Sequence, residues 1–282
     1  MNFFDCPVGV RQGCVLSPTI FSLLVNQLSI YITETGRHGI QLLSGLVELF
    51  ILFADDVALL ATTPYGLPNQ LYSLKACCGR LQMEVNKDKT KDTVFQKGGY
   101  LTKHEKWYYD GRDIEVVNKY HYLGFALTTT LSVKQGTDHL VAKGKKDVFI
   151  LCTSFQKCRE MTKETFFKIF DSKIQSVLLY SSVIWGLHIL DSIERVHLMA
   201  CKRYLGVPSR TANKMVYGEF GRYPLFVAYV RCIKYWFLLL YMEQSRLPNR
   251  AYRMLVNLDE NGEKCWTTEV GELMCKNGFY FV

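Results

Sequence analysis

Two adjacent aspartates, Asp55 and Asp56, are the residues best suited to chemistry. They interrupt an apolar run over residues 46–61, in which the only other charged residue is Glu48. No lysine or arginine occurs between His38 and Lys75, so neither carboxylate has a basic neighbour in the sequence. Adjacent anions beside apolar strands are costly to hold near a core unless a cation binds them. The pattern predicts either a divalent metal site or a solvated Asp-Asp turn.

Nucleotidyl transfer is a reaction that requires such a metal site. Two magnesium ions clamp the attacking and leaving oxygens of an in-line displacement, and carboxylates on a rigid hairpin fix the ions. The length of the apolar run suits two buried strands joined by a tight turn at the aspartates. We therefore expect a buried hairpin that carries both carboxylates at its turn.

Helical and hairpin patterns surround the aspartates. Ser17-Pro18 is typical of a helix start, and apolar residues follow at steps of three and four up to Tyr31. Residues 107–117 predict a hairpin around Asp110-Gly111, a dipeptide suited to a primed turn. A second helix is predicted by an apolar stripe at alternating steps of four and three: Leu67, Leu71, Leu74, Cys78, Leu81 and Val85.

Charge is unevenly distributed along the chain, whose net charge is +8. Residues 1–130 contain 12 lysines and arginines against 12 acids, and residues 131–253 contain 20 against 9. The last stretch, 254–282, has 2 against 5. Strand patterns also give way to helical ones from about His139. A basic helical part that grips a polyanion is one interpretation, and a solubilising surface is the alternative.

Four motifs resemble those of reverse transcriptases, in the same order. Phe53-Ala54-Asp55-Asp56 looks like the family's [YF]-A-D-D box, and residues 9–18, GVRQGCVLSP, resemble its template- and nucleotide-proximal segment. Asn86 with Lys89-Thr90-Lys91 resembles the palm motif that follows, and Tyr122-Leu123-Gly124 resembles the primer grip. The resemblance implies RNA-directed DNA polymerisation from a primer–template and deoxynucleotides.

The resemblance assigns roles to individual residues. Asp55 would ligate both metals, and Asp56 would support the site. The remaining contacts would be Arg11, Gln12 and Gly13 to nucleotide or template, Lys89 or Lys91 to the leaving pyrophosphate, and Tyr122, Leu123 and Gly124 to the primer end. Simpler interpretations stay open: a polar loop, a strand edge with a turn, and a solvated charge cluster in which Asp88 and Asp92 interleave the lysines.

The second half resembles LINE-type (non-LTR retrotransposon) enzymes in particular. The resemblance rests on Tyr180, Trp185-Gly186, Glu194, His197, Lys202, Leu205-Gly206-Val207, Glu219, Gly221, Pro224 and Tyr235-Trp236. Val183 is a departure, because such proteins tend to carry a glutamate just before the Trp-Gly pair. Basic and aromatic residues mix in this half: Lys143, Lys145, Lys146, Lys157 and Lys163 with Phe149, Phe155, Phe166 and Phe167. The lysines suit duplex phosphates, and the phenylalanines are expected in the core.

The resemblance also implies that the metal site is incomplete in these 282 residues. The family's further aspartate lies on an earlier palm strand, upstream of the Arg-Gln-Gly segment, where this chain carries only Asp5, in no matching context. Fingers and an N-terminal endonuclease are missing as well. We therefore expect a fragment whose cofactor would be Mg²⁺ or Mn²⁺ and which polymerises little or not at all by itself.

The patterns together predict an α+β fold: a partial polymerase palm with an antiparallel sheet and helices over residues 1–130, a basic helical thumb over 131–250, and the start of a truncated C-terminal region over 251–282. The expected partners are RNA template, DNA primer, RNA–DNA hybrid and deoxynucleotides. His197 and Cys201 have zinc-compatible spacing but no second pair, so no zinc is expected. No membrane segment or secretory signal is visible, which predicts an intracellular protein, nuclear or cytoplasmic. A non-catalytic nucleic-acid-binding remnant is the alternative function.

Overall fold

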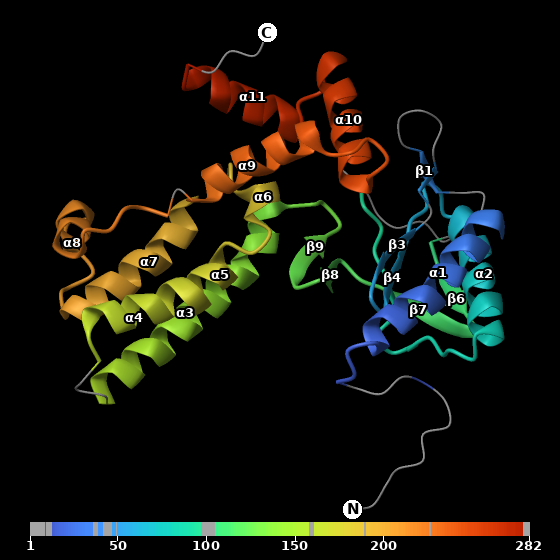
Figure 1. The fold of residues 1–282 in the computed structure, drawn as a ribbon, viewed down its shortest axis with the longest axis horizontal. Helices are drawn as coiled ribbons and strands as arrows, with labels where there is room; N and C mark the ends of the chain where they lie inside the picture. The colour runs from blue at the N-terminus through green and yellow to red at the C-terminus, as the bar shows by residue number, and fades with distance from the viewer. Residues whose placement is uncertain are drawn as a thin grey trace, which may run out of the picture. The chain divides into compact units, whose positions relative to one another are not determined.

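The structure is a computed structural model, drawn in Figure 1. It describes residues 9, 13–35, 39–41, 47–48, 50–96, 105–157, 161–188, 190–225 and 227–278. The chain divides into two compact units, one within residues 1–94 and 98–117 and the other within 95–97 and 118–282. The first unit mixes short strands with helices and the second is mainly helical, so the predicted α+β class is confirmed.

The first unit contains helices α1 (Ser17–Thr35) and α2 (Gly66–Arg80). Its strands are β1 (Ile40–Gln41), β2 (Val47–Glu48), β3 (Phe50–Phe53), β4 (Asp56–Leu59), β5 (Lys91–Asp92), β6 (Trp107–Tyr109) and β7 (Arg112–Val116). β1 pairs with β2 and β3 with β4, both antiparallel, and the third sheet has the order β5-β7-β6. Strand β5 runs parallel to β7, whereas an antiparallel sheet was predicted for the palm.

The core of the first unit lies between α1, α2 and the β6–β7 hairpin. Leu71, Leu74 and Cys78 of the predicted stripe are buried, together with Leu28 of α1. The indole of Trp107 donates a hydrogen bond of 2.9 Å to the carbonyl of Pro64, just before α2. This core confirms both predicted helices and the predicted hairpin.

The second unit opens with a hairpin of β8 (Lys119–Tyr122) and β9 (Phe125–Thr128). Its helices are α3 (Val133–Lys157), α4 (Lys163–Ile169), the π-helix η2 (Phe170–Ile174), α5 (Gln175–Leu178), α6 (Ser182–Trp185), α7 (Leu190–Leu205), α8 (Asn213–Phe220), α9 (Val227–Tyr241), α10 (Leu247–Glu260) and α11 (Trp266–Lys276). In Figure 1, α3, α4, α5 and α7 form a bundle, and α10 and α11 pack against α9.

Large apolar side chains fill the bundle of the second unit. Phe166, Phe170, Ile174, Leu178 and Trp185 are all fully buried. Between α4 and α5 the helix continues as the π-helical segment η2, whose turn is wider than that of an α-helix. A wider turn changes the direction in which the side chains after it point from the helix axis. The apolar run at 235–241 forms the end of α9 as a helix. No helix within the described residues is long and apolar enough to cross a membrane.

Candidate functional site

The two aspartates lie at the turn of the β3–β4 hairpin. The register pairs Phe53 with Asp56, which leaves Ala54 and Asp55 as the two loop residues. Both carboxylates are exposed to solvent. Ala54 has a φ of 52°, a left-handed conformation that costs a non-glycine residue roughly 1–2 kcal/mol. The turn therefore holds a strained backbone directly before the first aspartate.

The strands that carry the aspartates are less buried than expected. Every residue of β3 and β4 is half-buried or exposed, and Phe53 exposes 60% of its surface. In the part of the chain that the structure describes, these two strands pair only with each other. The prediction of buried strands is therefore only partly correct: Phe50, Leu52, Val57 and Leu59 pack against the core of the first unit without being fully buried.

The metal-binding capacity of the aspartate pair is limited to two carboxylates. Within the described ranges, no lysine, arginine or histidine forms an ion pair with Asp55 or Asp56. The same residues contain no group of three or more potential metal ligands. Magnesium requires a nearly octahedral shell of oxygens, and a two-metal centre requires more carboxylates than this pair offers. The described residues therefore do not fit a complete two-metal centre.

The two predicted palm lysines have different surroundings. The side-chain amide oxygen of Asn86 accepts hydrogen bonds of 3.1 Å from the backbone N–H groups of Asp88 and Lys89, and it thereby fixes the turn before β5. Lys91 forms a 2.6 Å ion pair with Glu115, its register partner on β7. Lys89 is exposed and forms no ion pair with any described residue. Of the two, Lys89 keeps its charge available to a ligand.

Asp92 departs from the interpretation of this segment as a solvated charge cluster. One oxygen of its carboxyl group is buried and accepts no hydrogen bond from any residue that the structure describes. Burial raises the pKa of Asp92 to about 6, although a hydrogen bond from the backbone of Thr93 opposes the change. Sequence reasoning missed this residue because it ends a run of alternating charges, a pattern typical of a solvated surface. Asp88, by contrast, forms an exposed ion pair with Arg112.

The segment before α1 is only partly described. Arg11 and Gln12 lie outside the described residues. Gly13 is exposed, and its φ of 82° is one that glycine adopts readily. Cys14 is exposed, and hydrogen bonds from the backbone of Leu16 and from Ser17 lower the pKa of its thiol. The structure therefore places Gly13 in a turn ahead of the helix, where no described residue lies within 4 Å of a Cβ built on the glycine.

The residues that resemble a primer grip form the turn of the β8–β9 hairpin. Tyr122 pairs with Phe125, and the loop residues Leu123 and Gly124 have φ values of 48° and 82°. Positive φ at both loop positions is the primed turn that fits the twist of a hairpin. Tyr180 contacts this turn, because its phenolic oxygen donates a hydrogen bond to the carbonyl of Leu123. The turn thus belongs to the second unit and is tied to its helical part.

The lysines named above are exposed in the second unit, whereas most of the phenylalanines named with them belong to its core or pack against it. Lys143, Lys145, Lys146, Lys157 and Lys163 are all exposed, so their charges face solvent. Phe166 and Phe167 are buried, as expected, and Phe155 packs against them. Phe149 is the exception among the four, since 60% of its surface is exposed and the guanidinium of Arg203 lies 5.5 Å from its ring centre.

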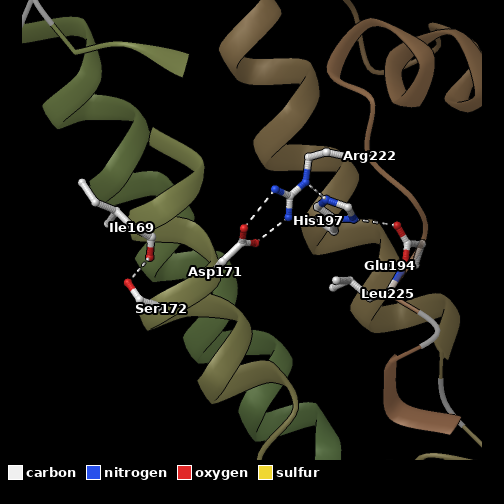
Figure 2. Close-up of polar contacts among 7 residues, drawn as sticks. All are labelled: Ile169, Asp171, Ser172, Glu194, His197, Arg222 and Leu225. Carbon is white, nitrogen blue, oxygen red and sulfur yellow. Dashed lines mark hydrogen bonds and ion pairs between the residues drawn. The ribbon is translucent and has the colours of Figure 1, made fainter. Parts of the chain in front are cut away.

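A chain of polar side chains crosses the second unit (Figure 2). Asp171 of η2 accepts hydrogen bonds of 2.5 and 3.1 Å from the guanidinium of Arg222, which also donates to Nε2 of His197 at 3.0 Å. Nδ1 of His197 lies 3.0 Å from Glu194. Because arginine can only donate, His197 carries its proton on Nδ1 in this arrangement. The resemblance singled out Glu194 and His197, whereas Asp171 and Arg222 were missed.

The zinc-compatible pair is used for packing. His197 and Cys201 are both fully buried on α7. Both ring nitrogens of His197 have protein partners, Glu194 and Arg222. Burial raises the pKa of the Cys201 thiol to about 12, which disfavours the thiolate that would bind a metal. These contacts explain the two residues without an ion.

Comparison with known families supplies an independent finding on the first part of the chain. Residues 3–127 match the family described as "Reverse transcriptase (RNA-dependent DNA polymerase)". The match includes the aspartate hairpin, the Asn86 turn and the β8–β9 turn. No curated protein matches the chain. This part of the chain is therefore similar to a polymerase-type catalytic domain, and in particular to that of reverse transcriptases.

Proposed function

We propose that the chain is a fragment of the RNA-directed DNA polymerase of a LINE-type (non-LTR) retrotransposon. The observation that carries the proposal is the position of Asp55 and Asp56 at an exposed hairpin turn inside the segment that matches reverse transcriptases. Their substrates would be deoxynucleotides on an RNA template with a DNA primer. The parent reaction would use the two-metal mechanism, with Mg²⁺ or Mn²⁺ as the ion.

Individual residues would contribute binding and positioning. Asp55 and Asp56 would supply two of the carboxylates that hold the ions. Arg11, Gln12 and Gly13 would contact nucleotide or template, and the charge on Lys89 would stabilise the leaving pyrophosphate. Lys91 suits this last role less well, because Glu115 neutralises it. The turn at Leu123 and Gly124 would position the primer end.

The LINE-type assignment is supported by residues of the second unit. Trp185, Glu194 and His197, which carry part of the resemblance, all have buried side chains in the bundle or polar contacts within it. Gly221 ends α8 with a φ of 62°, as a helix-ending glycine does. Residues with packing or hydrogen-bonding roles of this kind are expected to recur in proteins that share the fold. The resemblance in this half would then concern the fold as well as the sequence.

We infer that the 282-residue chain does not extend primers by itself. The reason is that, among the described residues, Asp55 and Asp56 do not belong to a group of three or more potential metal ligands. The test is a primer-extension assay with an RNA template, a DNA primer and either Mg²⁺ or Mn²⁺. No product above the level of Asp55→Ala is expected. Product that disappears with Asp55→Ala but not with Glu84→Ala, an exposed acid of the same unit, would overturn this inference.

A non-catalytic nucleic-acid-binding protein is the second candidate function. Residues 131–253 contain 20 basic against 9 acidic residues, and the lysines of α3 are exposed. Binding through phosphates predicts an affinity for RNA–DNA hybrid that falls steeply with salt. A gel-shift series over salt concentration tests this property. Absence of binding at low salt would exclude nucleic-acid binding by the second unit in either function.

A further inference from the structure

Four cationic or titratable side chains from two elements gather on one surface of the second unit. Lys119 and His121 are two residues apart on β8, so both point to the same face of the hairpin. His139 and Lys143 are four residues apart on α3, so they are neighbours on the helix surface. All four residues are exposed.

The two histidines are in direct contact. Their rings meet edge to face, with centroids 4.7 Å apart and planes at 66°. One turn before His139, Gly136 allows the hairpin to approach the helix closely: a Cβ on this glycine would lie 2.9 Å from the carbonyl oxygen of Ala126. Ala126 is the register partner of His121. Backbone packing of β9 on α3 therefore fixes the distance between the two rings.

The electrostatics of this surface favour an anion. Burial lowers the pKa of His139, and so do the neighbouring His121, Lys119 and Lys143. Helix α3 carries two acids, Asp138 and Asp147. Neither forms an ion pair with the four groups in the described part of the chain. Positively charged groups that repel one another without a counterion are stabilised when an anion binds beside them.

We propose that His121 and His139, with Lys119 and Lys143, form a binding site for one backbone phosphate of a bound nucleic acid, and that His139 takes up a proton as the phosphate binds. The imidazole N–H groups donate to the phosphate oxygens, and the two ammonium groups add charge. This site rests on the proposed nucleic-acid binding by the second unit. It adds a contact whose strength depends on pH.

The position of the site fits a longer path for the nucleic acid. Lys146 and Lys157 follow His139 and Lys143 at helical spacing, on the same side of α3. From His139 to Lys157 the helix rises about 27 Å, at roughly 1.5 Å per residue. Within the described residues, Lys146 and Lys157 form no ion pair either. The histidine pair lies at the hairpin end of this row of cations.

The sign of the pH dependence follows from proton uptake. If the bound state holds more protons than the free state, affinity rises as the pH falls. A fluorescently labelled RNA–DNA hybrid, titrated with the full chain at constant salt, should bind roughly 3- to 10-fold more tightly at about pH 5.5 than at about pH 7.5.

Variants separate the histidine pair from other groups that titrate in this range. The double variant His121→Asn/His139→Asn should lose most of the pH dependence and bind the hybrid less tightly than wild type at about pH 5.5. His188→Asn is the matched control, because His188 belongs to the same unit but pairs with Glu269 of α11. It should keep the wild-type pH profile. Lys143→Ala should make the affinity less dependent on salt. The slope of log affinity against log salt concentration should decrease in magnitude by the amount that corresponds to about one phosphate contact.

The possible results distinguish the phosphate site from the proposed function on which it rests. A pH profile that flattens in the double variant and persists in His188→Asn supports the phosphate site. A steep salt dependence with the same pH profile in wild type and double variant overturns the site but leaves the proposed function standing. Absence of hybrid binding at low salt and at both pH values overturns both.

Discussion

The phenolic oxygen of Tyr180 donates a hydrogen bond to the backbone carbonyl of Leu123, 57 residues earlier in the chain. The tyrosine ring also lies beside the next residue, because a Cβ on Gly124 would be 3.5 Å from it. Tyr180 is fixed in turn by Trp185, whose indole donates to its carbonyl at 2.8 Å. The hairpin turn that resembles a primer grip is thus held by the helical part of the same unit.

Replacing Tyr180 with phenylalanine should loosen this turn. The ring would remain and the hydrogen bond would be lost, so we expect the free energy of unfolding to fall by about 1 kcal/mol. Amide hydrogen exchange around Leu123 and Gly124 should become faster. Tyr223→Phe is the control, since Tyr223 is 78% exposed. Equal exchange rates in the two variants would contradict a role for Tyr180 at the turn.

Glu194 accepts hydrogen bonds through both of its carboxylate oxygens. One of its oxygens accepts hydrogen bonds from His197 and Tyr217, and the other accepts one of 2.5 Å from the backbone N–H of Leu225. Glu194→Ala leaves these donors unpaired in a largely buried place, so we expect a loss of about 3 kcal/mol in denaturant unfolding. Glu272→Ala, which removes an exposed 4.0 Å ion pair, should cost less than about 0.5 kcal/mol.

The same carboxylate predicts a direction for acid unfolding. Burial pushes the pKa of Glu194 upward, but the hydrogen bonds from His197, Tyr217 and Leu225 outweigh it, and the net pKa is below the usual 4.5. A carboxylate with a lowered pKa stabilises the folded state above its unfolded pKa, and this stability is lost as the pH falls through the folded value. The difference in unfolding free energy between wild type and Glu194→Ala should therefore shrink below about pH 4.5.

Local patterns sufficed for the elements whose residues interact with near neighbours. The stripe through Leu71, Leu74 and Cys78 predicted α2, because a helix brings residues three and four apart to one face. Asp110 and Gly111 both have positive φ, as the primed turn predicted from this dipeptide requires. The aspartate pair falls at a turn where it interrupts the apolar run, as predicted.

Contacts between distant residues could not be predicted in this way. Asp171 and Arg222 are 51 residues apart, and nothing in either local sequence indicates their pairing. The burial of Asp92 depends on its place in β5 beside β7, whereas most of the residues just before it in sequence, from Lys87 to Lys91, are charged. Strand burial at β3 and β4 was overestimated because an apolar run predicts a buried strand only where other elements cover it.

Replacing Asp92 with asparagine should stabilise the first unit at neutral pH. Its pKa is raised from 3.8 to about 6, so the folded state holds this proton more tightly than the unfolded state. Stability is therefore lost as the pH rises from about 4 to about 6, and an amide removes that loss. We expect a gain of roughly 1–2 kcal/mol at about pH 7.5, after allowance for partial exposure, and no gain near about pH 4. Equal effects at the two pH values would show that the carboxyl is solvated.

Gly136→Ala tests the packing that fixes the distance between the β8–β9 hairpin and α3. The new methyl group would lie 2.6 Å from the ring of Phe125 and 2.9 Å from the backbone oxygen of Ala126. The ring can move, but the backbone oxygen belongs to a paired strand, so helix and hairpin must separate. We expect a loss of about 1–3 kcal/mol in thermal or denaturant unfolding, although alanine favours helix more than glycine does.

Gly218→Ala is the matched variant, because Gly218 is a helical glycine of the same unit with open space around it. There the helix preference acts alone, and a gain of roughly 0.5–1 kcal/mol is expected. Opposite signs for the two substitutions would establish that Gly136 is needed for close approach. A gain at both positions would mean that α3 and the hairpin are separated by more than the structure shows, and the contact between His121 and His139 would then lose its support.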